Sequence, residues 1–371
     1  MSPQELAAWR MHTQRLWSAP FSKPADVVRW FGAMQAQEYA YAKWAIAQRC
    51  RRTGDTQVES SYATGEILRT HVIRPTWHFV HRDDLRWVLD ATRHRVHQIN
   101  GTYYRASGLD EGPFRRSARV LARALRGGNE LNRKELTEVL RKETGIDATG
   151  IRMAYMLMRA ELDGVIVSGS VGGKHPTFAA FADRVPMGTS IPREEAIAEL
   201  ALRYFRSRGP ATLRDFVRWS SLTVAEATAG LSSVRSSLKH RDINGRAYYF
   251  VARSTPKSPV SPRVDLVQAY DECIMSYSES KDVLRPDLTT RRVPNLNVYL
   301  HAVLLDGRLV GHWKAVRGAR SLIVEAALYR ALNTAERAAM DAATARLGRA
   351  FGVEARWMVV TTPTRESRRT P

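Results

Sequence analysis

A pattern of helical segments followed by two short strands and a tight polar turn recurs three times along this chain of 371 residues. The clearest copy begins at Asn132, a residue type that caps helices and here precedes the first helix of the copy. A second helix is expected over 151–162, and Asp163-Gly164 ends it. Strands over 165–167 and 177–179 follow, joined by a turn rich in Gly and Ser. This order of elements is typical of a winged helix, which is mostly a nucleic-acid-docking device. The pattern therefore predicts tandem winged helices.

Two further copies are expected on either side of the clearest one. The later copy begins near Thr212 and contains Asn244-Gly245, a strong hairpin signal because both residues tolerate positive φ. Its helices and strands are expected over 213–219, 224–231, 238–240 and 247–250. The earlier copy is the least regular. Its helices are expected over 25–34, 39–50 and 57–68, and its strand over 72–80.

The pattern changes to strands beyond a Pro- and Ser-rich stretch at 253–259, which we interpret as a domain boundary. Strands are expected over 266–270, 296–305, 308–314, 321–329 and 356–360, with a helix over 334–351. The tail over 361–371 is predicted to be disordered. The fold class is thus α+β, with three tandem winged-helix domains followed by a C-terminal β-barrel-like domain that has one helix. The expected domain ranges are 1–110, 111–188, 189–255 and 256–371.

The chain is strongly basic, with 57 Lys and Arg against 37 Asp and Glu and a formal net charge of +20. A field of this sign attracts polyanions, and arginine binds phosphate through two parallel hydrogen bonds. Charge and repeats together indicate a nucleic-acid partner. A composition that is basic for reasons unrelated to binding is the alternative.

Several classes of protein are not indicated. Cys50 and Cys273 lie far apart in apolar contexts and form neither a metal motif nor a disulfide framework, which fits a reducing cytoplasm. Neither a signal peptide nor an apolar run of about 18 residues is present, so we expect a cytoplasmic protein without a membrane span. Gly172-Gly173-Lys174 lacks the other residues of a P-loop, and we expect no cofactor and no metal.

Gln35-Ala36-Gln37, between two expected helices, is the first candidate site. In a non-helical link the two amides could point to one side and hold a water molecule between them. Amides do not titrate usefully, so such a pair could catalyse only where the leaving group is already good. Two polar residues that cap helix ends are the alternative interpretation.

The strand expected over 72–80 carries a second candidate cluster, formed by Arg74, Trp77, His78 and His81. Trp77 could stack on a base, and the basic side chains could meet phosphates. A half-buried strand with Trp77 in the core is the alternative.

Two other segments could carry function. Lys174, at an expected hairpin tip, is a plausible phosphate contact, and ordinary solubility is the alternative. Asp271-Glu272 are adjacent and would point to opposite faces of a strand, so they are poor candidates for a paired acid and base. We expect them to be solvated or paired with arginine.

Four segments, in this order and spacing, carry a resemblance that covers most of the chain. They are Gln35-Ala36-Gln37, 74–80, 208–220 and 271–277. The chain resembles the winged-helix DNA glycosylases of the helix-turn-helix 42 superfamily, which excise bulky alkylated bases and unhook interstrand crosslinks. The best-known branch protects producers of alkylating antibiotics. Gln35-Ala36-Gln37 matches the catalytic Gln–apolar–Gln motif of that family. Cys273 and Lys281 depart from the family pattern, where an aromatic residue and an arginine are common.

The resemblance implies a DNA glycosylase that acts on double-stranded DNA carrying N7-alkylguanine or N3-alkyladenine. Three units and a β-domain in one chain indicate a monomer, and we expect a monofunctional enzyme because no lysine except Lys43 lies beside the glutamine pair. The resemblance also implies that Gln35 and Gln37 position the water molecule. The residues expected to contact DNA are Lys43, Arg74, Trp77, His78 and Lys174. Because bulky adducts resist full extrusion into a tight pocket, we expect an open basic cleft formed by the winged helices. A closed pocket sized for one flipped base would contradict this expectation.

Two other classes of function remain open at this point. A non-catalytic winged-helix transcription regulator would bind one DNA sequence specifically at physiological salt, which a damage glycosylase does not need. A protein that shields adducts would bind alkylated DNA tightly and release no base.

Overall fold

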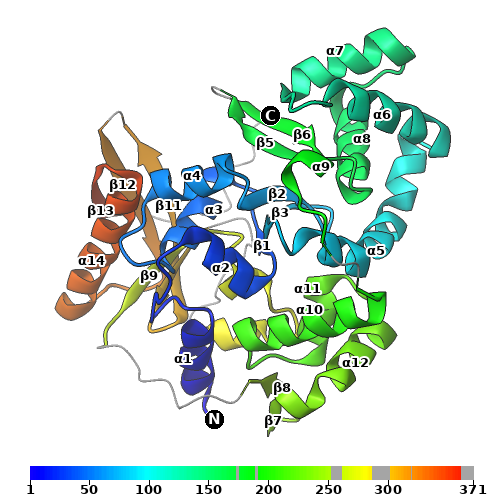
Figure 1. The fold of residues 1–371 in the computed structure, drawn as a ribbon. Helices are drawn as coiled ribbons and strands as arrows, with labels where there is room; N and C mark the ends of the chain where they lie inside the picture. The colour runs from blue at the N-terminus through cyan, green and yellow to red at the C-terminus, as the bar shows by residue number, and fades with distance from the viewer. Residues whose placement is uncertain (173–174, 189–190, 252–260, 286–300, 319, 361–371) are drawn as a thin grey trace, which may run out of the picture.

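The computed structural model describes residues 1–172, 175–188, 191–251, 261–285, 301–318 and 320–360. It is a mixed α and β protein in which three small units of similar order precede a larger C-terminal sheet (Figure 1). We call 24–81 the first unit, 111–180 the second unit and 193–250 the third unit. The long helix α5 (Leu85–Ala106) connects the first two. The predicted boundary at 253–259, the tail over 361–371 and the start of the strand predicted at 296 lie outside the described residues.

A three-stranded antiparallel sheet in the order β1-β3-β2 forms the centre of the first unit. In chain order its elements are α2 (Pro24–Phe31), β1 (Met34–Gln35), α3 (Tyr39–Ala47), α4 (Asp55–Ala63), β2 (Ile67–His71) and β3 (Trp77–His81). The helix predicted over 25–34 is too long, because Gly32 ends α2 with φ of 74° and an extended segment follows. The helix predicted over 57–68 is also wrong at its end. Gly65, with φ of 78°, turns the chain into β2, a strand that the sequence pattern did not indicate.

The second unit repeats this order with a sheet β4-β6-β5. Its elements are α6 (Glu111–Ala124), β4 (Leu131–Asn132), α7 (Arg133–Thr144), α8 (Gly150–Leu162), β5 (Ile166–Gly172) and β6 (His175–Ala180), followed by α9 (Phe181–Arg184). The predicted helix start at Asn132 is confirmed. Its side chain accepts hydrogen bonds from the backbone N–H groups of Lys134 and Glu135, and the Glu135 carboxylate accepts one from the Asn132 N–H.

The third unit has the same order again, with an isolated bridge between Ala211 and Tyr249 in place of the short first strand. Its elements are α10 (Arg193–Arg208), α11 (Leu213–Ser220), α12 (Val224–Ser233), the 3-10 turn η1 (Arg235–Ser237), β7 (Lys239–Ile243) and β8 (Arg246–Phe250). The predicted Asn244-Gly245 hairpin is confirmed. Both residues have positive φ, 50° and 74°, and Ile243 pairs with Arg246.

The C-terminal sheet has the strand order β13-β12-β11-β10-β9 and curls without closing. Its region contains β9 (Val264–Val267), α13 (Glu272–Met275), η2 (Lys281–Leu284), β10 (His301–Leu305), β11 (Arg308–Arg317), β12 (Ser321–Leu328), α14 (Thr334–Phe351) and β13 (Glu354–Val359). In the described part of the chain β9 and β13 pair with one neighbour each, so the predicted barrel is a half-barrel. Helix α14 contacts both edges, since Arg346 donates to the Val264 carbonyl and Trp357 donates to Asp341.

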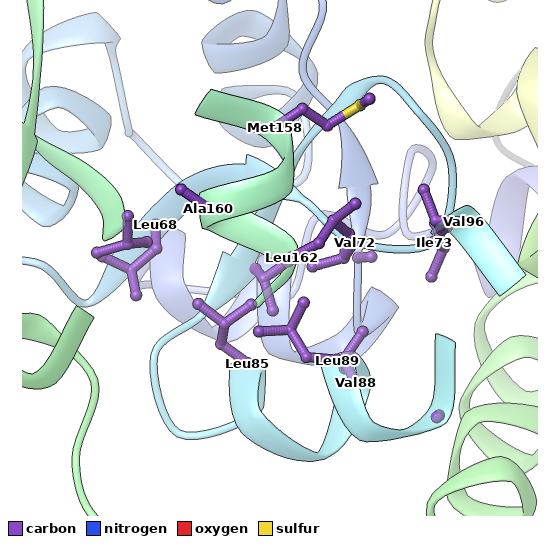
Figure 2. Close-up of a cluster of buried hydrophobic side chains, with 14 of the residues drawn as sticks. Leu68, Val72, Ile73, Leu85, Val88, Leu89, Val96, Met158, Ala160 and Leu162 are labelled. Atoms are coloured by element: carbon purple, nitrogen blue, oxygen red, sulfur yellow. The ribbon is translucent and has the colours of Figure 1, made fainter. Parts of the chain in front are cut away.

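The first unit shares a hydrophobic core with each of its neighbours. On one side, Phe31 and Trp44 pack in one cluster with Val303 and Leu347 of the C-terminal region. On the other side, the segment over 68–73 packs against α5 and α8, as the close-up of Leu68, Val72, Leu89 and Leu162 in Figure 2 shows. Burial of such side chains contributes about 1.5–3 kcal/mol each. The residues of β1 are therefore held between two apolar interfaces.

The N-terminal helix α1 (Pro3–Thr13) joins the third unit to the C-terminal region. Its fully buried Arg10 donates hydrogen bonds to the carbonyls of Pro210, at 3.0 Å, and Ser280, at 2.9 Å. Leu6 packs in one cluster with Tyr248. In the described residues no helix is both long and apolar enough to cross a membrane.

Candidate active site

Gln35 ends the short strand β1, and Gln37 lies two residues further on, in the link between α2 and α3 where the sequence placed them. Gln35 pairs with His78 across β1 and β3, and the N–H of Ala36 donates to the Trp77 carbonyl at 2.8 Å. Gln35 is 4 % exposed, whereas Gln37 is exposed to solvent. Neither caps a helix, because the C-cap of α2 is Gly32 and the N-cap of α3 is Glu38. The helix-capping interpretation is therefore wrong.

The side chain of Gln35 is oriented by an arginine. Nη2 of Arg74 donates to Oε1 of Gln35 at 2.9 Å. A guanidinium has donors only, so this contact fixes which end of the amide is the oxygen. No described residue forms a hydrogen bond with Nε2 of Gln35, and that NH2 group is free to donate to a ligand. Burial lowers the pKa of Arg74 to about 10. Since this value is still well above 7, the side chain remains cationic near neutral pH.

His78 completes this contact as a neutral base. Its Nδ1 lies 2.8 Å from the Thr76 carbonyl, which can only accept, so Nδ1 carries the proton. Its Nε2 then accepts from Nη2 of Arg74 at 3.3 Å. Burial, with the charge of Arg74, lowers the pKa of His78 well below its ordinary value. Arg74 and His78 thus turn inward to support Gln35.

Gln37 is held mainly through its backbone. Arg69, on β2, donates from Nη2 to the Gln37 carbonyl at 3.2 Å and from Nε to the Ala36 carbonyl at 2.9 Å. The same guanidinium lies 3.9 Å from the ring centre of Trp77. Oε1 of Gln37 accepts only a long contact of 3.4 Å from the Trp77 N–H. Sequence reasoning missed Arg69 because the residue lay just beyond a predicted helix over 57–68 and was assigned to no element.

The buried carboxylate of Glu272 contacts the backbone of Gln35. Oε1 of Glu272 accepts the N–H of Gln35 at 2.8 Å, and Oε2 accepts from Nη2 of Arg208 at 2.8 Å and from Nε1 of Trp219 at 3.1 Å. Burial alone would raise the pKa of Glu272, but Arg208, Arg74 and the Gln35 N–H lower it to about 2. Glu272 is therefore ionised and acts as a fixed acceptor.

Arg208 links the Glu272 carboxylate to the backbone just before Gln35 in the sequence. It is fully buried and donates to the carbonyls of Phe31, at 2.8 Å, and Ala33, at 2.7 Å. The neighbouring Asp271 forms a second buried ion pair, with Arg49, at 2.8 Å. Of the two expected alternatives for Asp271 and Glu272, solvation or pairing with arginine, the structure shows pairing with arginine. The prediction that they lie on a strand is wrong, because they begin the short helix α13.

The remaining predicted site residues lie in different settings. Lys43 is 6 % exposed, and its ammonium contacts Asp55 at 2.8 Å and Glu59 at 2.5 Å. His81 is half-buried beside Asp83. Lys174 lies outside the described residues. Trp77 is half-buried rather than a core residue.

A cleft of about 860 Å³ opens beside Gln37, between the first and second units. We call it the inter-unit cleft. Its lining includes Trp77 on the first unit and Ile151, Tyr155 and Met158 on α8. This volume falls in the range of sites for drug-sized ligands, whereas a single flipped base takes a snug pocket. Over the described ranges no group of three or more His, Cys, Asp or Glu is placed to hold a metal ion.

Comparison with known proteins defines the class as a DNA glycosylase. The family model "DNA glycosylase AlkZ-like" matches residues 28–350, and the chain therefore belongs to the AlkZ-like DNA glycosylase family. The resemblance noted in the sequence is thereby confirmed.

Two relatives from Streptomyces sahachiroi are similar to this chain over most of its length. The protein described as an interstrand DNA cross-link repair glycosylase is 23% identical over 326 residues, which cover 84% of this chain and 88% of that protein. The solved structure of the DNA glycosylase AlkZ has a TM-score of 0.79 at 21% identity and covers 97% of this chain and 100% of that chain. At this identity the structural likeness concerns the fold.

Proposed function

We propose that this DNA glycosylase hydrolyses the N-glycosidic bond of N7-alkylguanine or N3-alkyladenine nucleotides with bulky or crosslinked adducts. The observation that carries the proposal is the placement of Gln37, exposed at the inter-unit cleft, two residues from the anchored Gln35. The cross-link repair named for the S. sahachiroi relative agrees with it. Repair of such damage, including self-resistance to alkylating natural products, is the biological role that we infer.

The chemistry suits a site without a strong acid or base. Alkylation at N7 or N3 makes the purine cationic, so the electron pair of the breaking N9–C1′ bond neutralises the base. The leaving group then needs no proton. The oxygen of a water molecule bonds to C1′ in an oxocarbenium-like transition state, and its proton passes to solvent. What the protein must supply is a placed water molecule and fixed dipoles.

The hydrogen bonds of the two glutamines suggest different roles. Arg74 already donates a hydrogen bond to Oε1 of Gln35, so Gln35 offers its own NH2 group to a lone pair of the water molecule. Oε1 of Gln37, with only a long contact to the Trp77 N–H, can accept a proton of the same molecule. One donor and one acceptor would orient the water lone pair toward C1′. We propose that Gln35 and Gln37 are the catalytic residues in this sense.

The three units are proposed to act as tandem winged helices that dock one monomer on duplex DNA. The order of helices and strands in each unit supports this proposal. Exposed arginines on one helix of the second unit supply cations for phosphates. They are Arg115, Arg116, Arg119, Arg123 and Arg126, on α6 or just beyond its end. Trp77 and Lys174 remain proposed DNA contacts, and Arg74 and His78 act through Gln35.

Base release from a duplex with one N7-alkylguanine tests the proposal. Gln35→Ala and Gln37→Ala should bind the duplex as wild type does and release the base about 10²–10³-fold more slowly, the usual effect of removing one preorganised dipole. Gln98→Ala, an exposed glutamine on α5, is the matched control and should cleave normally.

Other outcomes would support other classes of function. Tight binding to alkylated DNA without release from any adduct would indicate a shielding protein, and sequence-specific binding to undamaged DNA a regulator. We also propose a monofunctional enzyme, since Lys43, the lysine nearest in sequence to the pair, is ion-paired. A covalent DNA adduct trapped by borohydride would contradict that.

A further inference from the structure

We propose that an arginine-rich cavity at the C-terminal end of α3 binds a phosphate group. The cavity has a volume of about 510 Å³, and we call it the arginine cavity. Its charged lining residues are Arg52, Arg263, Asp265, Arg346 and Arg349. The inference goes beyond the proposed function and does not depend on the roles of Gln35 and Gln37.

The arginine cavity is a site separate from the glutamine pair. Helix α3 begins two residues after Gln37, and Ala47 and Gln48, at its other end, line the cavity. Nine residues at 1.5 Å each place the two ends of this helix roughly 13 Å apart. The rest of the wall comes from the segments 16–19 and 50–54, from β9 and the residue before it, and from the last turns of α14. The arginine cavity shares no lining residue with the inter-unit cleft.

The positive charge of the cavity exceeds what its one carboxylate pairs with. Asp265, which is 2 % exposed, lies 2.9 Å from Arg263 and 3.5 Å from Arg346. The side chains of Arg52 and Arg349, both exposed, form no hydrogen bond or ion pair within the described part of the chain. Burial, with the charges of Arg263 and Arg349, lowers the pKa of Arg346, although Asp265 acts in the opposite direction. An anion that entered the cavity would relieve this crowding of like charges.

An unpaired donor in the same wall indicates which anion fits. The side-chain NH2 group of Gln48 is buried and has no acceptor among the described residues. Buried donors are rarely left unpaired, so this group suits a ligand oxygen. A phosphate group presents more acceptor oxygens than a carboxylate does, and arginine binds it through two parallel hydrogen bonds. It can therefore accept from Gln48, Arg52 and Arg349 together.

The backbone of the cavity wall is strained at two positions. Arg52 has φ of 52° and Ala19 has φ of 33°, although neither is a glycine. Positive φ is costly for residues with a Cβ atom, and such residues cluster at ligand sites. Glycine adopts this conformation without strain. Arg52→Gly therefore removes the cation while it favours the observed backbone.

Thermal unfolding in inorganic phosphate tests the proposal. The Tm of wild type should rise as phosphate replaces chloride at constant ionic strength. Arg349→Gln and Arg52→Gly should need roughly tenfold more phosphate for the same rise, the usual effect of losing a hydrogen bond to a charged group. Both residues are exposed, so the variants should fold. Arg337→Gln, an exposed residue near the start of α14, is the matched control and should respond as wild type does.

Two further measurements distinguish the sources of the phosphate. If the cavity holds a backbone phosphate of DNA, the salt slope for binding an undamaged duplex should be smaller by about one for Arg349→Gln than for Arg337→Gln. If it holds a free phosphomonoester, adenosine monophosphate should raise the Tm of wild type more than that of Arg349→Gln, and the salt slopes should be equal. Either result supports a phosphate site.

The inference would be overturned if Arg349→Gln and Arg52→Gly matched Arg337→Gln in phosphate, in adenosine monophosphate and in the salt slope. None of these measurements uses base release. A failure of the proposed function is therefore distinguishable from a failure of this inference.

Discussion

Glu272 should contribute more to the free energy of unfolding than any exposed carboxylate does. The substitution Glu272→Gln tests this. The side chain is 1 % exposed and accepts hydrogen bonds from Arg208, Trp219, Ser276 and the backbone N–H of Gln35. Glutamine keeps the shape and one acceptor. It also removes the charge and places an NH2 group against donors, which leaves the buried Arg208 without its ionic partner.

The magnitude follows from the pKa. The pKa of Glu272 is lowered from 4.5 to about 2, and each pKa unit corresponds to about 1.4 kcal/mol, so the folded state favours the ionised form by roughly 3 kcal/mol. This agrees with the cost of about 3–5 kcal/mol for breaking a buried ion pair. Because the folded pKa lies below the unfolded value, this stabilisation is complete above pH 4.5. It is lost as the pH falls from 4.5 toward 2.

Urea unfolding of wild type and Glu272→Gln at pH 7 and at pH 3.5 would measure this contribution. The variant should lose about 3 kcal/mol at pH 7 and a smaller amount at pH 3.5. Glu138→Gln, an exposed carboxylate paired with Arg141, is the control and should change stability by less than about 0.5 kcal/mol. A loss below about 1 kcal/mol at pH 7, or the same loss at both pH values, would refute the electrostatic reasoning.

Two further substitutions separate support of the site from contact with DNA. Lys43→Met should lower the free energy of unfolding by about 1–2 kcal/mol, because Asp55 and Glu59 lose a hydrogen-bonded cation, and should leave the salt dependence of DNA binding unchanged. A salt slope smaller by about one would instead show that Lys43 contacts a phosphate. Arg74→Gln should slow base release about tenfold or more under single-turnover conditions while DNA affinity stays near that of wild type, since Arg74 orients Gln35. A loss of affinity with an unchanged rate of release would return Arg74 to the role of a DNA contact.

The parts of the fold that the sequence predicted well are those encoded by neighbouring residues. Asn132 and Glu135 cap a helix from three positions apart, and Asn244-Gly245 forms a turn from adjacent positions. The Gln35-Ala36-Gln37 segment also follows this rule, because a link between two helices was expected there. A local signal needs no knowledge of the rest of the chain.

The missed features depend on contacts between distant residues. β2 is stabilised by pairing with β3 and by burial against the second unit, and the N–H of Arg69 donates to Ser168. A helical pattern read from residues up to 68 could not include these contacts. In the same way, the sequence pattern did not show that β9 and β13 stay unpaired with each other in the described part of the chain, where α14 contacts both strands.

The anchoring of Gln35 explains why the site needs more than the first unit. Its N–H is held by Glu272, which lies 237 residues away in the chain, and Glu272 is held by Arg208 from the third unit. Arg208 in turn fixes the carbonyls of Phe31 and Ala33 that lead into Gln35. An amide positions water well only if its own freedom is small. The first unit supplies the pair, but the third unit and the C-terminal region hold one member in place.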